Sequence, residues 1–143
     1  MIHKNEMPIL EYDSAQTAVI MPNRKELFNF PKKAVFPFLF DEIEKYAETN
    51  KCTKIAEFVS ITKIYPIYKT NYQGYDICLC QAPLGSSASV QILDFLIGYG
   101  VEEIISVGTC GDLLGYAENE FLLPVKHYGT RAHLIIICHP AEL

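Results

Sequence analysis

The sequence predicts an α/β fold in which a mixed central sheet is flanked by helices. Two observations lead to this class. An apolar helical segment that ends on glycines stands between two strand-like segments, which is the order of a β-α-β crossover. The second of those segments, 103–107 ("EIISV"), is a continuous apolar run, which is typical of a central parallel strand covered on both faces. The length of 143 residues corresponds to one domain.

The composition is that of a soluble globular protein, since 50% of the residues are apolar and 20% are charged. The net charge of −5 and the scattered Lys and Arg residues argue against a nucleic-acid partner. We expect no secretory leader, because polar residues interrupt the first segment, and no apolar stretch reaches the ~18 residues of a membrane span. The five cysteines form neither a CxxC pair nor a metal-ligand pattern. We therefore expect a cytoplasmic protein with reduced thiols and no bound metal or membrane partner.

The elements that precede the crossover follow from residue spacing. Apolar residues recur at helical spacing in 38–51, opposite acidic side chains, which predicts an amphipathic surface helix. The segments 54–70 and 75–83 are rich in β-branched and aromatic residues and predict strands, joined by a turn that contains Gly74. Cys78 and Cys80 point to the same side of the second segment and are expected in the core.

The crossover helix is predicted to begin at Ser86 and Ser87, which are good N-cap residues. Residues 90–99 are apolar nearly all round, so we expect this helix to be buried on more than one side. Gly98 and Gly100 stand where a helix C-terminus favours glycine. After the apolar strand, residues 121–125 ("FLLPV") predict one more strand.

A ligand site is predicted where the loop 82–87 enters the helix and a Gly-Thr-Cys-Gly turn leaves the strand, because open α/β sheets bind ligands beside such strand ends. The helix start favours an anion. Gly108 and Gly111 would let the backbone approach a ligand closely. Thr109 offers a hydroxyl to phosphate or sugar oxygens, and Cys110 offers a small apolar wall. The alternative is ordinary turn chemistry with serines that only cap the helix.

Residues 85–126, from "GSSASVQILDFLIGYGVEEIISVGTCGDL" to "FLLPVK", resemble the nucleoside phosphorylase superfamily, which includes uridine phosphorylase and the bacterial hexameric purine nucleoside phosphorylases. The family's pattern is a Gly-rich turn, Pro-Ser, a helix, Gly-Val, an apolar strand and Arg-Val-Gly-(Ser/Thr)-Cys-Gly. The Val-Gly-Thr-Cys-Gly stretch carries most of the resemblance. It implies a phosphorylase/hydrolase-like fold, of which residues 1–126 would form the N-terminal portion.

The resemblance also implies an activity, the phosphorolytic cleavage of a nucleoside by a pentosyltransferase of nucleoside catabolism or salvage. Phosphate, as co-substrate and without a further cofactor, attacks the anomeric carbon through an oxocarbenium-like state while the base leaves. By position, Ser87 and Thr109 would bind phosphate, and Thr109, Gly108, Cys110 and Gly111 would bind the nucleoside. No catalytic residue is assigned. Since family members are dimers, trimers or hexamers, we expect a homo-oligomer.

Three departures from the family pattern leave alternatives open. The strand has Ser106 where the family has a phosphate-binding arginine, and Ala82 and Leu84 replace the Gly pair before the helix. The N-terminal Gly-Asp-Pro-x-Arg turn is missing, and Arg24 in "MPNRKE" is its nearest equivalent, although a solvated arginine is the simpler interpretation. The alternatives are a nucleosidase, which uses water instead of phosphate, and a non-catalytic nucleoside- or phosphate-binding or assembly module.

The tail 127–143 does not resemble the family. In a shifted reading frame, permitted codons spell Arg-Asp-Glu-Gly-Thr-Ser-Tyr-His-Tyr, which family members carry at this point. We therefore predict that a one-base deletion has made this tail and that the chain is truncated and inactive alone; the alternative is a native short protein. Residues 134–138 predict a strand. An exposed sheet edge and apolar face would favour self-association.

Overall fold

The computed structural model describes residues 2–6, 11–15, 17–22, 28–111, 120–130 and 133–140. The chain divides into two compact units, Met1–Thr109 and Cys110–Leu143, and each unit is described by itself. The first unit begins with two short antiparallel strands, β1 (Ile2–His3) and β2 (Tyr12–Asp13).

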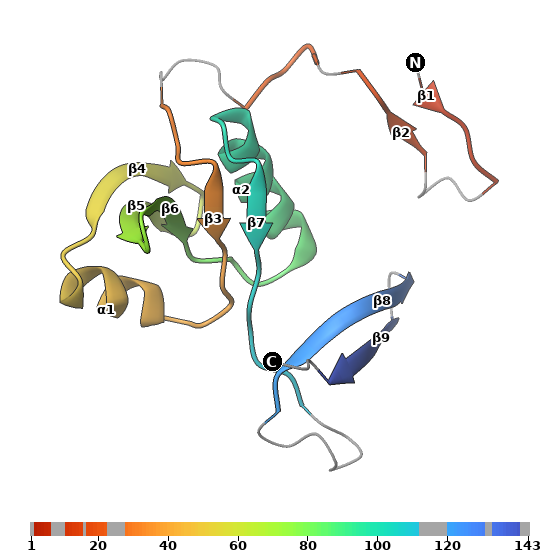
Figure 1. The fold of residues 1–143 in the computed structure, drawn as a ribbon. Helices are drawn as coiled ribbons and strands as arrows, with labels where there is room; N and C mark the ends of the chain where they lie inside the picture. The colour runs from red at the N-terminus through yellow and green to blue at the C-terminus, as the bar shows by residue number, and fades with distance from the viewer. Residues whose placement is uncertain are drawn as a thin grey trace. The chain divides into compact units, whose positions relative to one another are not determined.

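A mixed five-stranded sheet forms the centre of the first unit, with the strand order β4-β5-β6-β3-β7 (Figure 1). Its strands are β3 (Lys33–Val35), β4 (Thr53–Val59), β5 (Ile64–Tyr72), β6 (Tyr75–Cys80) and β7 (Glu103–Ile105). The neighbours β4, β5 and β6 pair antiparallel, whereas β6, β3 and β7 are parallel. This sheet, together with two helices, confirms the predicted α/β class.

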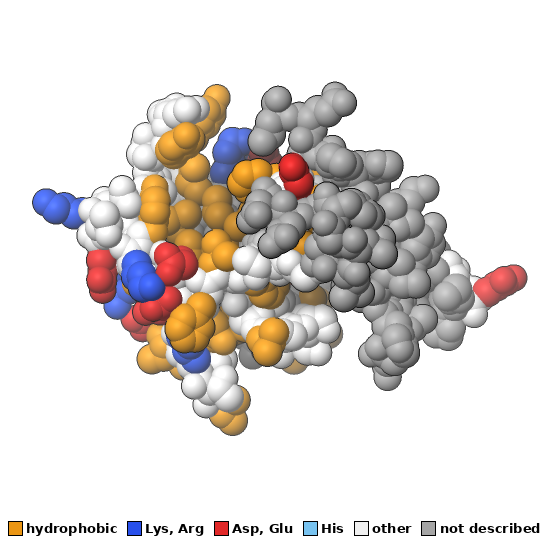
Figure 2. Space-filling model, turned by 90° about the horizontal axis from the view of Figure 1, so that it is seen from below, with side chains coloured by type: hydrophobic (Ala, Val, Ile, Leu, Met, Phe, Trp, Pro, Cys, Tyr) orange, Lys and Arg blue, Asp and Glu red, His pale blue; other side chains and the backbone are white. Residues whose placement is uncertain are grey.

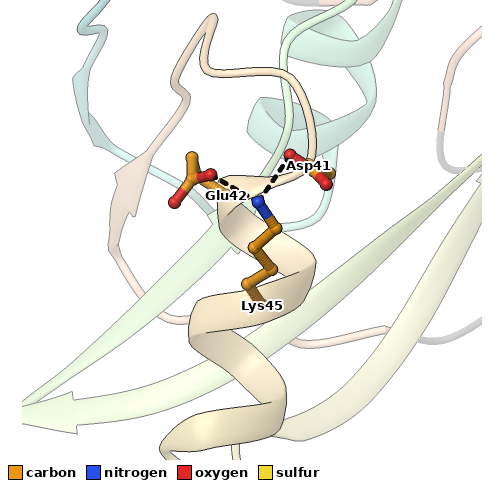
Figure 3. A network of polar contacts seen from close by, with 3 residues as sticks. All are labelled: Asp41, Glu42 and Lys45. Atoms are coloured by element: carbon orange, nitrogen blue, oxygen red, sulfur yellow. Dashed lines mark hydrogen bonds and ion pairs between the residues drawn. The ribbon is translucent and has the colours of Figure 1, made fainter.

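The first helix, α1 (Glu42–Thr49), lies within the predicted range and buries Ile43 and Ala47. At its start the Lys45 ammonium lies 2.8 Å from Glu42 Oε1 and 3.2 Å from Asp41 Oδ1 (Figure 3). The hydrogen bonds to Glu42 and Asp41 raise the pKa of Lys45. All three side chains are exposed to solvent, so these ion pairs stabilise the helix only slightly.

The second helix, α2 (Ser86–Gly98), connects β6 to β7 and crosses β3, as expected for a β-α-β unit. Its C-terminus is a Schellman motif, because the Val101 N–H donates to the Leu96 carbonyl and the Gly100 N–H donates to the Ile97 carbonyl. Gly100 has φ +110°, which L side chains rarely adopt. The predicted glycine stop at Gly100 is therefore confirmed.

The predicted N-cap is wrong. Gly85 is the N-cap residue, with φ +98°, and Ser86 and Ser87 are the first helical residues, with no side-chain hydrogen bond capping the helix. The serine that stabilises this end is Ser89, whose buried hydroxyl donates to the Pro83 carbonyl at 2.9 Å. This bond ties the first turn of α2 to the loop that follows β6.

Two predictions about burial are also wrong. Helix α2 buries Ile92 and Leu96 but exposes Val90 (60%) and Ile97 (56%), so it is covered along one stripe. Strand β7 is not a central strand, because in the described part of the chain it pairs with β3 alone and forms an edge of the sheet. Its Ile105 is 64% exposed. An apolar run of strand length does not by itself reveal how many neighbours a strand has.

The core lies between α2 and one face of the sheet. Five aromatic rings at centroid distances of 4.9–6.1 Å form its largest cluster, made by Phe28, Phe30, Phe58, Phe95 and Tyr99. Cys78 and Cys80 are fully buried beside Ile67, which confirms their predicted place in the core. Burial raises the pKa of each of these thiols to about 12.

The hairpin between β5 and β6 turns at Gln73 and Gly74, which have φ +50° and +86°. Positive φ at both positions is the signature of a two-residue type I′ turn, so the predicted glycine turn is confirmed.

The second unit is a hairpin of β8 (Leu122–Thr130) and β9 (His133–Pro140), paired antiparallel with an irregularity between Pro124 and Lys126. The strands predicted at 121–125 and 134–138 are confirmed. The predicted border between residues 126 and 127 falls inside β8, and the out-of-frame origin of the tail stays a prediction.

Candidate functional site

The predicted site lies where the parallel strands β6, β3 and β7 end, the edge at which α/β proteins bind ligands. The segment Phe36–Phe38, which follows β3, connects the neighbouring loops there. The Ala82 N–H donates to the Pro37 carbonyl at 2.8 Å, and the Phe38 N–H donates to the Val107 carbonyl at 2.7 Å. The backbone of this segment therefore holds both the loop after β6 and the turn after β7. Strand β3 was not predicted from the sequence, although the short apolar run 34–36 before Pro37 indicates it.

Gly108 is held against Phe38 in an isolated parallel bridge that prolongs the β3–β7 pairing. A Cβ atom on Gly108 would lie 3.3 Å from the Phe38 Cβ, which is closer than most such contacts. The close contact with Phe38 thus explains why position 108 is a glycine, and this contact could not be predicted from the sequence. A Cβ atom on Gly111, in contrast, would meet no atom within 4 Å among the residues that the structure describes. Gly111 therefore remains compatible with the predicted close approach of a ligand.

The division between the two units runs through the predicted site. Ser87, Gly108 and Thr109 belong to the first unit, and Cys110 and Gly111 belong to the second. All five residues are exposed. Their joint arrangement around one ligand stays a prediction.

Ser87 lines a groove of about 480 Å³ between the start of α2 and the turn that joins β4 to β5. Its apolar lining includes Phe58, Tyr65 and Ile92. Its polar lining comes from Ser60, Thr62, Ser87 and Gln91. Gly108 and Thr109 are not among the described residues that line it. Ser87, one of the two predicted phosphate ligands, thus lies in a groove that was not predicted from the sequence, and it does not share this groove with Thr109, the other one.

Two side chains near the strand ends clarify the polar chemistry there. The Ser106 hydroxyl donates to the Phe36 carbonyl at 2.9 Å, so this residue holds β7 to the segment after β3. The Gln81 side-chain oxygen, in the loop after β6, is buried and accepts no hydrogen bond within the described part of the chain. A buried acceptor without a donor is unfavourable by about 1–3 kcal/mol. The Gln81 oxygen is thus an unsatisfied acceptor near the strand ends, which could not be predicted from the sequence.

The described residues supply few free cations for a phosphate. Lys45 is paired with Glu42 and Asp41, and Lys63 lies 3.6 Å from Glu44. Arg24, the predicted arginine candidate, lies outside the described residues. Among the residues that the structure describes, no group of three or more His, Cys, Asp or Glu side chains is placed to hold a metal ion.

Figure 2 looks onto the end of the sheet where β3 and β7 finish, and apolar side chains gather on the described part of that face. The exposed large apolar residues of the segments that leave β3 and β6 include Phe38 (44%), Phe40 (82%) and Leu84 (97%). Apolar surface of this kind suits the ring of a base or the face of a sugar better than it suits an isolated anion.

The fold defines an α/β protein, and the strand ends with the loops that follow them define its candidate site. No protein-family model matches the chain, and no curated protein matches it significantly. None of the described helices has the length and apolar character needed to cross a membrane.

Proposed function

We propose that the chain has the phosphorylase/hydrolase-like fold of the nucleoside phosphorylase superfamily and binds a nucleoside and phosphate where β6, β3 and β7 end. Phosphorolysis of the N-glycosidic bond is the reaction that such a site serves. The observation that carries the proposal is the Val-Gly-Thr-Cys-Gly stretch beginning at Val107, which leaves β7 at the ligand-binding edge of the sheet. Its resemblance to the family motif specifies the substrate class.

The local chemistry supports binding of a sugar and a base. Exposed Thr109 offers a hydroxyl at the turn, and a Cβ atom at Gly111 would contact no described residue within 4 Å. The buried oxygen of Gln81 needs a donor, which a ribose hydroxyl or a base amino group would supply. In the reaction, the bond between C1′ and the base nitrogen breaks as phosphate oxygen bonds C1′. The electron pair remains on the base, which then takes up a proton.

One observation favours hydrolysis as the second candidate. The position of the family's phosphate-binding arginine is Ser106, and its hydroxyl is already bonded to the Phe36 carbonyl. A site with less positive charge binds phosphate less tightly, and water then competes as the nucleophile. A nucleosidase would share the nucleoside pocket and lose the dependence on phosphate.

The experiment is an equilibrium binding titration with purine and pyrimidine nucleosides, followed by a base-release assay with and without phosphate. Saturable binding that is weakened in the Thr109→Ala variant is the expected result. Release that requires phosphate would identify a phosphorylase, and release that does not would identify a nucleosidase. Binding without any release would identify a non-catalytic module. The absence of nucleoside binding at millimolar concentrations would overturn the proposal.

A further inference from the structure

Gly98 is the last residue of α2, and the backbone does not require a glycine there. Its φ is not positive, whereas the chain leaves the helix at Gly100, where φ is +110°. A glycine at a helical position is less favourable than an alanine, because it loses more conformational freedom on folding. The end of the helix therefore explains the glycine at position 100 but not the glycine at position 98.

The space beside Gly98 is occupied by Pro22, a residue 76 positions earlier in the chain. A Cβ atom on Gly98 would lie 2.6 Å from the Pro22 Cγ and 3.4 Å from the Pro22 Cβ. Real Cβ atoms do not approach another atom as closely as the first distance, and the proline ring cannot rotate away as a flexible side chain would. Any other residue at position 98 would therefore have to displace Pro22 from α2.

Pro22 ends a segment that is otherwise mostly exposed, and we call the described residues of 2–22 the N-terminal arm. Among the side chains described there, those of Glu11, Met21 and Pro22 are half-buried and the others are exposed, with Val19 at 104%. Segments that bury so little surface open locally at a low free energy. The burial of the arm is thus concentrated at its C-terminal end, where Pro22 packs on α2.

The chain is held differently from Phe28 onward. The rings of Phe28 and Phe30 belong to the aromatic cluster with Phe95 and Tyr99, and Phe30 is 4% exposed. The Phe30 N–H also donates to the Tyr99 carbonyl at 3.0 Å. These contacts are part of the core, so the segment that leads into β3 stays in place when the arm moves.

We propose that Pro22 and Gly98 fasten the N-terminal arm to the last turn of α2, and that the arm opens at this contact without unfolding of the sheet. In the closed state the Pro22 ring covers Gly98, and in the open state the last turn of the helix is accessible. This conformational device is separate from the nucleoside site. Ser87, at the other end of α2, lies about 16 Å from Gly98 at 1.5 Å per helical residue.

The first test is a pair of engineered cysteines in a chain whose cysteines other than Cys78 and Cys80 are replaced by serine. The Pro22 Cβ and a Cβ at position 98 lie 3.4 Å apart, close to the ~3.5–4.5 Å of a disulfide. The double variant Pro22→Cys, Gly98→Cys should form an intramolecular disulfide with oxidised glutathione, which peptide mass spectrometry identifies. The control Pro22→Cys, Val90→Cys should not, because Val90 lies about 12 Å earlier along α2.

The second test measures backbone ¹⁵N relaxation in Gly98→Val. We expect the order parameters of residues 17–21 to fall below about 0.6, while those of β3 to β6 keep their wild-type values. Ile97→Ala, one residue away in α2 and 56% exposed in the wild type, is the control and should leave the arm ordered. If Gly98→Val fails to fold, the cysteine pair still decides.

Three results would overturn the proposal. The first is a cysteine pair at 22 and 98 that forms no more disulfide than the control pair. The second is an arm whose order parameters are the same in the wild type and in Gly98→Val. The third is a loss of order in the sheet together with the arm, since the arm would then not open separately.

Discussion

Gly108 lies directly against Phe38, and a Cβ atom at Gly108 would come within 3.3 Å of the Phe38 Cβ. This contact fixes the beginning of the Gly-Thr-Cys-Gly turn to the segment after β3. The first glycine of the turn therefore has a structural role, whereas a Cβ atom at Gly111 would touch none of the described residues. Substitutions can therefore distinguish the roles of Gly108 and Gly111.

We expect Gly108→Val to lower the free energy of unfolding by about 1–3 kcal/mol, because its side chain would collide with Phe38. Gly108→Ala should have a smaller effect in the same direction. Gly111→Ala is the control and should change stability by less than about 0.5 kcal/mol, while weakening nucleoside binding. Urea denaturation and a binding titration measure the two quantities. Equal destabilisation by Gly108→Val and Gly111→Ala would contradict the structural role assigned to Gly108.

Ser89 and Ser86 provide a matched pair at the start of α2. Ser89→Ala removes a buried hydrogen bond to the Pro83 carbonyl and should lower the free energy of unfolding by about 1 kcal/mol. Ser86→Ala should have almost no effect, because Gly85 occupies the N-cap position. Thermal and urea denaturation of both variants would measure the difference. If Ser86→Ala instead lowered the free energy of unfolding by about 1 kcal/mol, Ser86 would cap the helix, which would contradict the structure.

Gln81→Leu separates a ligand-binding role from a structural one. The substitution removes a buried acceptor without a donor, so stability should be unchanged or slightly higher. Nucleoside affinity should fall about tenfold, which corresponds to about 1.4 kcal/mol for the loss of one hydrogen bond. Gln91→Leu, in the groove beside α2, is the control and should bind normally. Weaker binding in Gln91→Leu but not in Gln81→Leu would indicate that the nucleoside binds in the groove instead.

The buried thiols Cys78 and Cys80 predict a loss of stability in alkali. Their folded-state pKa of about 12 lies above the ordinary value of 9.0, because burial disfavours the thiolate. Below pH 9 the thiols are neutral in both states. Between pH 9 and 12 the unfolded state alone loses these protons, so stability falls as the pH rises.

Urea denaturation at a series of pH values measures this loss. The double variant Cys78→Ala, Cys80→Ala, although less stable throughout, should show a shallower decline between pH 9 and 12. In the folded wild type, exposed Cys110 should react with iodoacetamide while both core thiols stay protected. A pH dependence that is the same in the wild type and the double variant would show that other groups cause it.

The elements that depend on short-range backbone preferences and on apolar spacing could be predicted from the sequence. The turn at Gly74, the glycine stop at Gly100 and the helix over 38–51 all follow from backbone preferences or from apolar spacing. The place of β7 at the sheet edge did not follow, since the number of neighbours of a strand is a property of the tertiary structure. The exposed flank of α2 was missed for the same reason.

The candidate site was predictable only in part. The Gly-Thr-Cys-Gly turn and its position after a parallel strand could be predicted from the sequence. The contact of Gly108 with Phe38 could not, because it joins segments that are 70 residues apart in the chain. The unsatisfied oxygen of Gln81 could not be predicted either, since it depends on which residues surround the loop after β6.

The central claim is that a nucleoside binds at the turn after β7. The most direct measurement is a titration of the ¹⁵N-labelled chain with a nucleoside in phosphate buffer, followed by the backbone amide shifts of residues 108–111 and the side-chain amide of Gln81. Our account predicts that these signals shift together and saturate with one dissociation constant. Signals that stay in place at saturating nucleoside, or shifts confined to the groove beside Ser60 and Gln91, would contradict it.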